Sequence, residues 1–223
     1  MKKKMKRALG VAAVVADVTL MATGCVSGVV DLDDDWTHLG KVEVSAPFSR
    51  TVEVNGQTSV KIAGLNGSIR VSAIPDAQNV TVNAIRTVRS DSRWDAQDHL
   101  SKLQVSVQLS SRQVDIKTIQ PAFSGGRTSV VDNEIGVPSH FLANVTNGNG
   151  SIRLDGVRAD VKVTNGNGGV ALVDHMGSSW VSVGNGEISA STVLPEGGQI
   201  VHAVGNCTIS LTVPTGVSAT FGA

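Results

Sequence analysis

Aromatic residues are scarce in this 223-residue chain: they make up 3% of it, and tyrosine is absent. Cysteine occurs only twice, at Cys25 and Cys207, which is too few for a disulfide framework. Long runs rich in Leu, Ala, Glu and Lys are also missing, which argues against a mainly helical protein. The 24 glycines, beside abundant Val, Ser, Thr and Asn, instead indicate short β-strands joined by Gly and Asn turns.

A basic patch of the kind that binds nucleic acid is also absent. The formal net charge of the chain is zero, but residues 1–24 hold five basic side chains and one acidic side chain. The remainder therefore holds 14 basic and 18 acidic residues and carries a net charge of about −4. Nucleic acid is excluded as an expected partner on this ground.

The N-terminus has the three parts of a secretory signal peptide. A basic segment, MKKKMKR, precedes a mostly apolar run, and the small residues Ala22, Thr23 and Gly24 then lead to Cys25. This order resembles the bacterial lipoprotein signal, whose cysteine is acylated and becomes the first residue of the mature chain. The resemblance implies lipidation at Cys25 and, because Val26 follows, the outer membrane of a Gram-negative envelope. The alternative is an ordinary secreted protein cleaved near Gly24.

A transmembrane helix is not expected here, because Asp17 splits an apolar run that is already short of the ~20 residues needed. Residues 25–40 follow as an acidic segment that contains Asp31, Asp33, Asp34 and Asp35. We interpret this segment as a solvated tether, and loose cation binding is the alternative.

Residues 41–119 alternate between apolar and polar positions, which predicts a series of short strands. The segments are KVEVSAPF, RTVEVNG, two strands around Leu65-Asn66-Gly67, NVTVNAIRTV, QVSVQLS and QVDIKTI. Between them, SDSRWDAQDHLSKL predicts one helix of about three turns with Ser90 or Asp91 as its N-cap. Residues 120–130 are predicted to link this region to the repeat that fills 131–223.

The repeat is built on an Asn-Gly-Asn-Gly tetrad. Its first glycine falls at Gly148, Gly166, Gly184 and Gly205, so the intervals are 18, 18 and 21 residues. An apolar-x-apolar pair follows each tetrad, as in Ile152/Leu154. The repeat-turn residues are Asn147, Gly148, Asn149, Gly150, Asn165, Gly166, Asn167, Gly168, Gly184, Asn185 and Gly186.

A fixed period of about 18 residues indicates stacked coils of a β-solenoid. Equivalent apolar residues would then form columns in the core at ~4.8 Å spacing. Gly and Asn suit the corner because they adopt positive φ at low cost. Stacked Asn side chains are also expected to hydrogen-bond along the axis. Cys207 occupies the position of the last tetrad glycine, where we interpret it as a tolerated small residue rather than a reactive thiol.

The segment LANVTNGNGSIRLDGVRADVKVTNGNGGVALVD, with LPEGGQIVHAVGNCTISLTVP, resembles a bacterial family described as adhesin-like, with β-strand repeats and without known function. The resemblance covers residues 41–221. It implies an all-β fold, a right-handed parallel β-helix with 18–21-residue coils, preceded by further strands and one short helix. It also implies a secreted or lipid-anchored envelope protein, and it supplies no catalytic residues.

The sequence contains no complete motif for a cofactor, a metal or a catalytic nucleophile. GNGSIR lacks the third glycine of a dinucleotide fingerprint and no helix follows it. The calcium repeat needs Asp where Ile152 and Val170 stand, the five histidines share no metal-ligand spacing, and no nucleophile motif occurs. Neither a metal nor a cofactor is therefore expected. His202 aligns with Val163 and Val181 and is interpreted as a strand histidine rather than a ligand.

A carbohydrate-active enzyme would need paired acids and aromatic platforms. Asp155, Asp160, Asp174 and Glu187 are scattered without a common column, and Trp180 is either a sugar platform or an apolar cover over a turn. The favoured hypothesis is a non-enzymatic, lipid-anchored envelope protein that serves as a structural or protein-interaction module. A surface adhesin is the alternative, and an enzyme is the third. The expected partners are the membrane, through the lipid, and a protein or a second copy of the chain.

Overall fold

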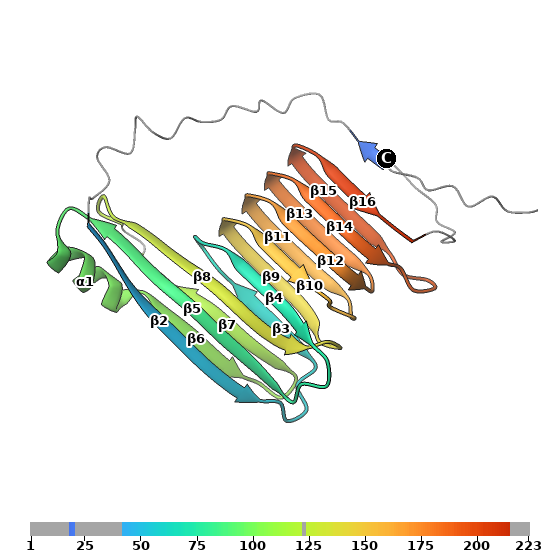
Figure 1. The fold of residues 1–223 in the computed structure, drawn as a ribbon, viewed down its shortest axis with the longest axis horizontal. Coiled ribbons are helices and arrows are strands. Elements are labelled where there is room, and N and C mark those ends of the chain that lie inside the picture. Colours follow the sequence, from blue (N-terminus) through green and yellow to red (C-terminus); the bar gives the residue numbers. More distant parts are fainter. Residues whose placement is uncertain (1–17, 21–41, 122–123, 215–223) are drawn as a thin grey trace, which may run out of the picture.

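A computed structural model describes residues 18–20, 42–121 and 124–214, and their regular structure is β-strand apart from one helix (Figure 1). Before the repeat come β1 (Val18–Leu20), β2 (Val42–Glu53), β3 (Ser59–Ala63), β4 (Ile69–Ile74), β5 (Asn79–Ser90), α1 (Arg93–Lys102), β6 (Gln104–Leu109), β7 (Gln113–Ile119) and β8 (Thr128–Pro138). The repeat holds β9 (Leu142–Asn149), β10 (Ile152–Asp155), β11 (Val161–Asn167), β12 (Val170–Met176), β13 (Ser179–Asn185), β14 (Ile188–Val193), β15 (Ile200–Asn206) and β16 (Ile209–Thr212).

The strands form two sheets, and the chain is therefore all-β apart from α1. Sheet A has nine strands in the order β1-β16-β14-β12-β10-β4-β8-β5-β2, and sheet B has seven in the order β15-β13-β11-β9-β3-β7-β6. From β9 onward, consecutive strands alternate between the two sheets. Figure 1 shows these strands stepping away from α1, which lies at the opposite end of the molecule.

The expected 18-residue register is present in the pairing of the repeat strands. Ile152 pairs with Val170, Val170 with Ile188, and Ile188 with Ile209, always in parallel. Ile69 of β4 pairs with Ile152, so the segment after Gly67 belongs to the same stack. Each of these inward side chains is 1% exposed except Ile209, which is half-buried in the final coil. The columns therefore form a continuous core that becomes open at β15 and β16.

The sheets are mixed, and this corrects the expectation of a parallel β-helix over the whole of 41–223. β5 pairs antiparallel with both β2 and β8, β6 pairs antiparallel with β7, and β1 pairs antiparallel with β16. For β6 and β7 the reason is local, because a short turn joins them and antiparallel neighbours need only a short connection. Both sheets contain strands from before and from within the repeat.

Two boundaries also differ from those predicted. The two alternating segments in 41–56 form the single strand β2, because all twelve of its residues pair with β5. Pro47 is accommodated because β2 is an edge strand, where one side of the backbone needs no donor. The predicted linker ends early, since β8 begins at Thr128, where it pairs with Arg89 of β5.

The helix α1 is confirmed, but its N-cap is Ser92 rather than Ser90 or Asp91. The Ser92 hydroxyl accepts a hydrogen bond from the Asp95 backbone N–H at 3.2 Å. Ser90 is the last residue of β5, and its hydroxyl already donates a hydrogen bond to the Asp95 carboxylate. The helix packs on β2 and β5, and it buries Ala96, His99 and Leu100.

Candidate functional site

The third residue of each tetrad forms a ladder of side-chain amides along one corner of the molecule. Each Nδ2 donates to the Oδ1 of the preceding member: Asn149 to Asn66 at 2.7 Å, Asn167 to Asn149 at 2.7 Å, Asn185 to Asn167 at 2.8 Å and Asn206 to Asn185 at 2.8 Å. The expected hydrogen bonds between stacked Asn side chains are confirmed. We call Asn66, Asn149, Asn167, Asn185 and Asn206 the asparagine ladder.

The first residue of the tetrad points inward instead. Asn147 is 3% exposed and Asn165 is 1% exposed. The Nδ2 of Asn165 donates to the carbonyl oxygens of Gly150, at 2.8 Å, and Gly168, at 2.9 Å. Asn147 Nδ2 donates in the same way to Gly67, at 2.9 Å. These amides satisfy turn carbonyls that would otherwise be buried without donors, so their role is to hold the corner.

The tetrad glycines lie where neighbouring coils come too close for a side chain. A Cβ at Gly184 would lie 2.5 Å from the carbonyl oxygen of Gly166. The fourth position has positive φ, which is 112° at Gly168 and 146° at Gly186. Cys207 occupies this position in the last coil with φ 147°.

The outer face of sheet B carries two rows of aligned side chains. One row is Lys61, Asn144, Lys162, Trp180 and Val201, and the next is Ala63, Thr146, Thr164, Ser182 and Ala203. Trp180 is 37% exposed and Val201 is 50% exposed. Trp180 therefore stands on a strand between Lys162 and Val201 and does not cover a turn. We call these two rows the Trp180 face.

The outer face of sheet A carries charge. Asp155 bonds Arg70 at 2.9 Å and Arg153 at 2.8 Å, and this carboxylate is therefore neutralised by two guanidinium groups. Asp160 accepts a hydrogen bond from the Ser178 backbone N–H at 2.8 Å. Asp174 is exposed at a register shift in β12, and Glu187 is exposed beside the corner. These four acids do not converge as a catalytic pair would.

A serine and two histidines meet inside the repeat. Ser179 Oγ lies 2.9 Å from His202 Nε2, and His175 Nδ1 lies 3.0 Å from the Val157 carbonyl oxygen. Burial lowers the pKa of His202 to about 4, with His175 adding a smaller effect, and burial also lowers the pKa of His175. Ser179 is fully buried and His202 Nδ1 has no hydrogen-bond partner among the described residues, so the pair lacks the third group that orients the base in a catalytic triad.

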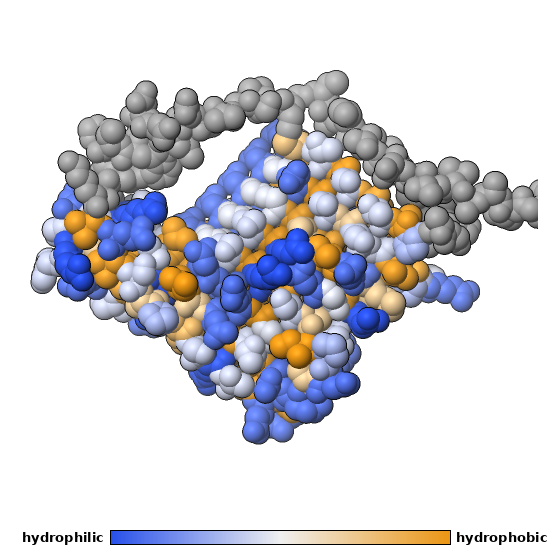
Figure 2. All heavy atoms as spheres, in the orientation of Figure 1, coloured by the Kyte–Doolittle hydropathy of each residue, from blue (hydrophilic) through white to orange (hydrophobic). Residues whose placement is uncertain are grey.

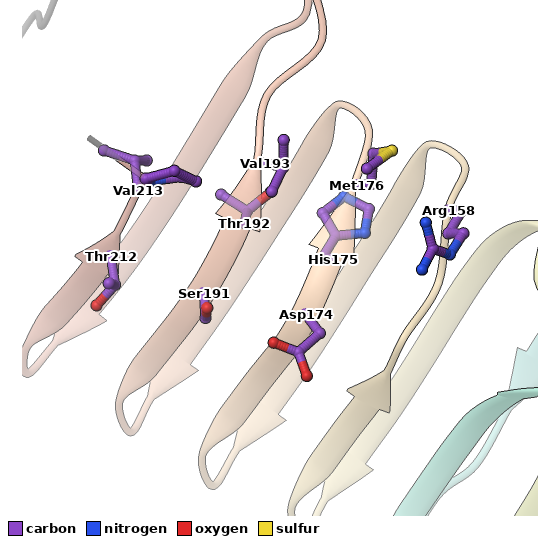
Figure 3. Close-up of a pocket in the computed structure, with 10 residues that line it drawn as sticks. Arg158, Asp174, His175, Met176, Ser191, Thr192, Val193, Thr212 and Val213 are labelled. Atoms are coloured by element: carbon purple, nitrogen blue, oxygen red, sulfur yellow. The ribbon is translucent and has the colours of Figure 1, made fainter. Parts of the chain in front are cut away.

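A shallow groove of about 370 Å³ lies along the ends of β12, β14 and β16 (Figure 3). Asp174, Ser191, Thr192 and Thr212 line it, and Arg158 closes one side. Asp174 has the positive φ of 50°. Asp174 is the only carboxylate among the lining residues, so the groove holds neither an acid pair nor a metal-binding set.

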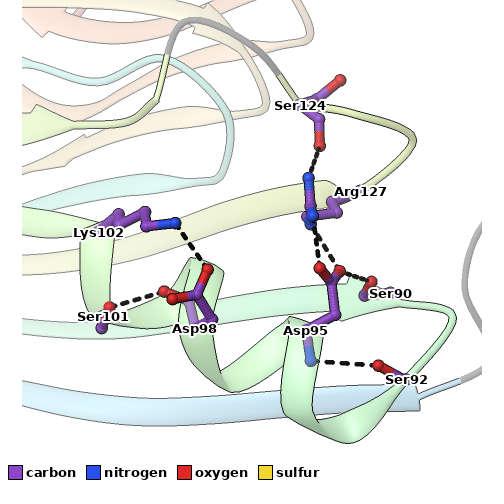
Figure 4. Close-up of polar contacts among 8 residues, drawn as sticks. All are labelled: Ser90, Ser92, Asp95, Asp98, Ser101, Lys102, Ser124 and Arg127. Atoms are coloured by element: carbon purple, nitrogen blue, oxygen red, sulfur yellow. Dashed lines mark hydrogen bonds and ion pairs between the residues drawn. The ribbon is translucent and has the colours of Figure 1, made fainter.

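A salt bridge between Asp95 and Arg127, which are far apart in the sequence, fixes the start of α1 (Figure 4). Arg127 donates through Nε, at 2.6 Å, and through Nη2 to the Asp95 carboxylate, and Arg127 Nη1 donates to the Ser124 carbonyl oxygen at 3.1 Å. The hydrogen bonds from Arg127 and Ser90 hold the pKa of Asp95 well below its usual range. This arrangement ties the loop before β8 to the helix.

Part of the predicted site lies outside the described residues, namely Cys25 with Ala22, Thr23 and Gly24. Within the described ranges, the structure holds no cluster of three or more metal-ligating side chains. No helix in the same ranges is long and apolar enough to cross a membrane.

No protein-family model and no curated protein matches the sequence. Solved structures do match. A candidate cell adhesion protein from Clostridium sporogenes aligns with 76% of this chain and 99% of its own, at 11% identity and a TM-score of 0.50. A candidate adhesin and a candidate lipid-binding protein from Parabacteroides distasonis align at 10% and 9% identity, over 71% and 75% of this chain and 77% and 95% of theirs, with TM-scores of 0.29 and 0.23. The first of these shows a shared, adhesin-like fold.

Sequence reasoning missed the salt bridge between Asp95 and Arg127 at α1. Asp95 and Arg127 are 32 positions apart and follow no shared pattern, so only the fold brings them together. The sequence could have predicted that Asn147 and Asn165 point inward, because they lie two positions after the buried valines Val145 and Val163.

Proposed function

We propose that this chain is a non-enzymatic envelope protein, anchored by a lipid on Cys25, whose β body serves as a structural or protein-interaction module. The observation that carries the proposal is the Trp180 face. Parallel strands in a fixed register give it straight rows of small, cationic and exposed apolar side chains. Aromatic residues such as Trp180 are enriched in protein interfaces.

The surface of the molecule also supports an interaction with a partner. On the side seen in Figure 2, hydrophobic residues lie in patches between polar ones. Exposed large apolar side chains on sheet B include Leu142, at 48%, besides Trp180 and Val201. Such patches mark interaction sites more often than single scattered side chains do.

A photo-cross-linking experiment in the native cell tests the interaction role. A photoreactive amino acid at position 180 is expected to give a discrete covalent adduct after irradiation. The same residue at Ser189, exposed on the outer face of sheet A, is the matched control and is expected to give none. No adduct at either position, or equal adducts at both, would contradict a role for the Trp180 face.

The alternative is a surface adhesin that binds host or matrix material, and the fold shared with a candidate cell adhesion protein supports it. The two functions differ in which way the body faces. If protease added to intact cells digests the body, the adhesin is favoured. If the body is protected until the outer membrane is opened, an inward-facing scaffold is favoured.

A carbohydrate-active enzyme is the third hypothesis. Against it stand the paired state of Asp155, the backbone contact of Asp160 and the isolation of Asp174. Asn substitutions at all three positions are expected to leave glycan turnover by cell extracts unchanged. A loss of turnover in the triple variant would revive this hypothesis.

For the repeat alone, we propose that β9–β16 wind as a right-handed parallel β-helix. The parallel 18-residue register supports this winding, since a strand that returns in parallel to its own sheet makes a right-handed crossover in nearly all proteins. A crystal structure of the full chain tests the hand, and a left-handed repeat would contradict it.

A further inference from the structure

The last coil of the repeat, formed by β15 and β16, is an open end of the molecule (Figure 1). β15 is the outermost strand of sheet B, and no described strand lies beyond it. Val204 of β15 and Leu211 of β16 point inward but are only half-buried. Val183 and Ala190, which pair with them one coil earlier, are each 2% exposed. A further pair of strands over this coil would bury the apolar surface that is left uncovered.

The last coil also lacks the charges that earlier coils carry. Residues 158–175 contain two basic and two acidic side chains, whereas residues 197–214 contain no Asp, Glu, Lys or Arg. Exposed edge strands usually carry charges or proline that prevent pairing with another chain, and β15 and β16 have neither. Charged residues are likewise depleted in the core of protein interfaces. The composition of this coil therefore suits burial against a protein.

The pairing of β16 shows how another strand fits on its edge. β1 pairs with β16 antiparallel, with Thr19 opposite Ser210. β1 reads Val-Thr-Leu and β16 begins Ile-Ser-Leu, so both have a β-branched apolar residue, a hydroxyl residue and leucine in the same order. A second β16, related by a twofold axis at Ser210, would place Leu211 opposite Ile209 in the same manner. β1 precedes Cys25, so in the mature chain of our proposed function this edge is free.

A second copy of the chain can cover both edges of the last coil at once. β15 and β16 lie in different sheets, so a partner must offer two strands at the separation of the two sheets. The last coil of a second copy has this arrangement, and a twofold axis perpendicular to the repeat makes both strand pairs antiparallel. Twofold homodimers, in which each subunit buries the same patch, are the commonest oligomers.

We propose that two copies of the mature chain join end to end through their last coils, with β16 paired to β16 and β15 paired to β15 across a twofold axis. The paired β15 strands would join the two copies of sheet B, and the two Trp180 faces would then form one continuous surface. The dimer rests on the proposed function in one respect, which is the removal of β1 with the signal.

A cysteine on the twofold axis tests the pairing in cells. Ser210→Cys is made in a chain that also carries Cys207→Ser, and the Ser210 side chain is exposed. The two introduced thiols would lie opposite each other, at a separation that a disulfide spans. Ser189→Cys in the same background is the matched control, because Ser189 pairs with Ser210 one coil earlier and would lie three strand spacings, ~14 Å, from its copy. Mild oxidation is expected to link Ser210→Cys into a dimer and to leave Ser189→Cys unlinked.

Ser210→Lys tests whether the contact holds the dimer without a cross-link. Two lysines that face each other across the axis repel, so the dissociation constant of the dimer is expected to rise at least about tenfold. Ser189→Lys is expected to leave this constant unchanged. Sedimentation in detergent measures both. Since both serines are exposed in one copy, neither substitution is expected to lower the midpoint of thermal unfolding.

Mass spectrometry of the N-terminal peptide in the same samples shows whether the signal has been removed. With the signal removed, a monomeric wild-type chain, or equal cross-linking at positions 210 and 189, would overturn the dimer and leave the proposed anchoring intact. A retained signal would contradict the proposed anchoring instead. The cross-linking comparison is then made on the chain without residues 1–24, where the absence of a disulfide at position 210 would overturn the dimer as well.

Discussion

The first tetrad glycine is required because the backbones of successive coils touch there. A Cβ at Gly184 would lie 2.5 Å from the Gly166 carbonyl oxygen, whereas a Cβ at Gly169 would meet the Glu187 side chain at 3.5 Å. The first distance forces the coils apart, and the second is ordinary van der Waals contact.

Gly184→Ala is therefore expected to lower the free energy of unfolding by about 1–3 kcal/mol, as overpacking usually does. Gly169→Ala, in the same repeat, is expected to change it by less than about 0.5 kcal/mol. Urea unfolding measures both. Equal effects of the two substitutions would show that the coils are not in the contact described.

His202 gives the fold a dependence on pH. Its pKa is about 4 in the folded protein, against 6.5 for an ordinary histidine, because burial disfavours the charged ring. The unfolded chain therefore binds a proton at a higher pH than the folded chain does. The stability that rests on the neutral ring is complete above pH 6.5 and is lost as pH falls toward 4.

This histidine is expected to contribute up to about 3 kcal/mol to the fall in unfolding free energy over that window. Val163 and Val181 occupy the same column, so His202→Val is a tolerable replacement. Urea unfolding at several pH values is expected to show a shallower dependence in His202→Val. His175 and His99 remain in both proteins, so the difference between them isolates His202. Identical pH profiles would refute the assignment.

At the scale of elements, the two kinds of tetrad asparagine differ in whether water can replace the hydrogen bonds of their side chains. Asn167 belongs to the exposed ladder, whereas Asn165 is buried against the carbonyls of Gly150 and Gly168. Asn167→Ala is expected to cost about 0.5–1.5 kcal/mol of unfolding free energy, and Asn165→Ala more than about 2 kcal/mol, since buried acceptors lose their donor. A larger loss in Asn167→Ala than in Asn165→Ala would reverse this view of the corner.

One long-range salt bridge adds to the packing of α1 on β2 and β5. Arg127→Met removes both hydrogen bonds to Asp95 and is expected to speed amide hydrogen exchange in α1 and in the loop before β8, with the repeat strands unchanged. Lys102→Met removes only the exposed Lys102–Asp98 pair and is expected to have little effect. Equal exchange in the two variants would indicate that α1 is held by packing alone.

The repeat could be predicted from sequence because its constraints are local and recur. The tetrads set the turns, the alternation sets the inward side, and the 18-residue interval sets the register. The antiparallel pairs of β2, β5 and β8 were not predictable in this way, since alternation marks a strand without naming its neighbour.

At the scale of the molecule, the anchoring signal that we propose precedes a regular β body in the sequence. The body is all-β, and it shares its fold with a candidate cell adhesion protein. Its repeat strands align rows of side chains on a rigid face, which suits presentation to a partner. The lipid on Cys25 remains our proposal, because that residue lies outside the described part of the chain.

The most direct test of the account compares the wild-type chain with Cys25→Ala after cell fractionation, with mass spectrometry of the mature N-terminal peptide. Cys207→Ser is the control, because it removes the other cysteine of the chain without touching the signal. We predict that the mature N-terminus of the wild-type chain is an acylated Cys25. We also predict that wild type and Cys207→Ser are found in the membrane fraction, and that Cys25→Ala, which cannot form this acylated end, is released from the membrane. An unmodified Cys25, with Cys25→Ala bound to the membrane as wild type is, would contradict the account.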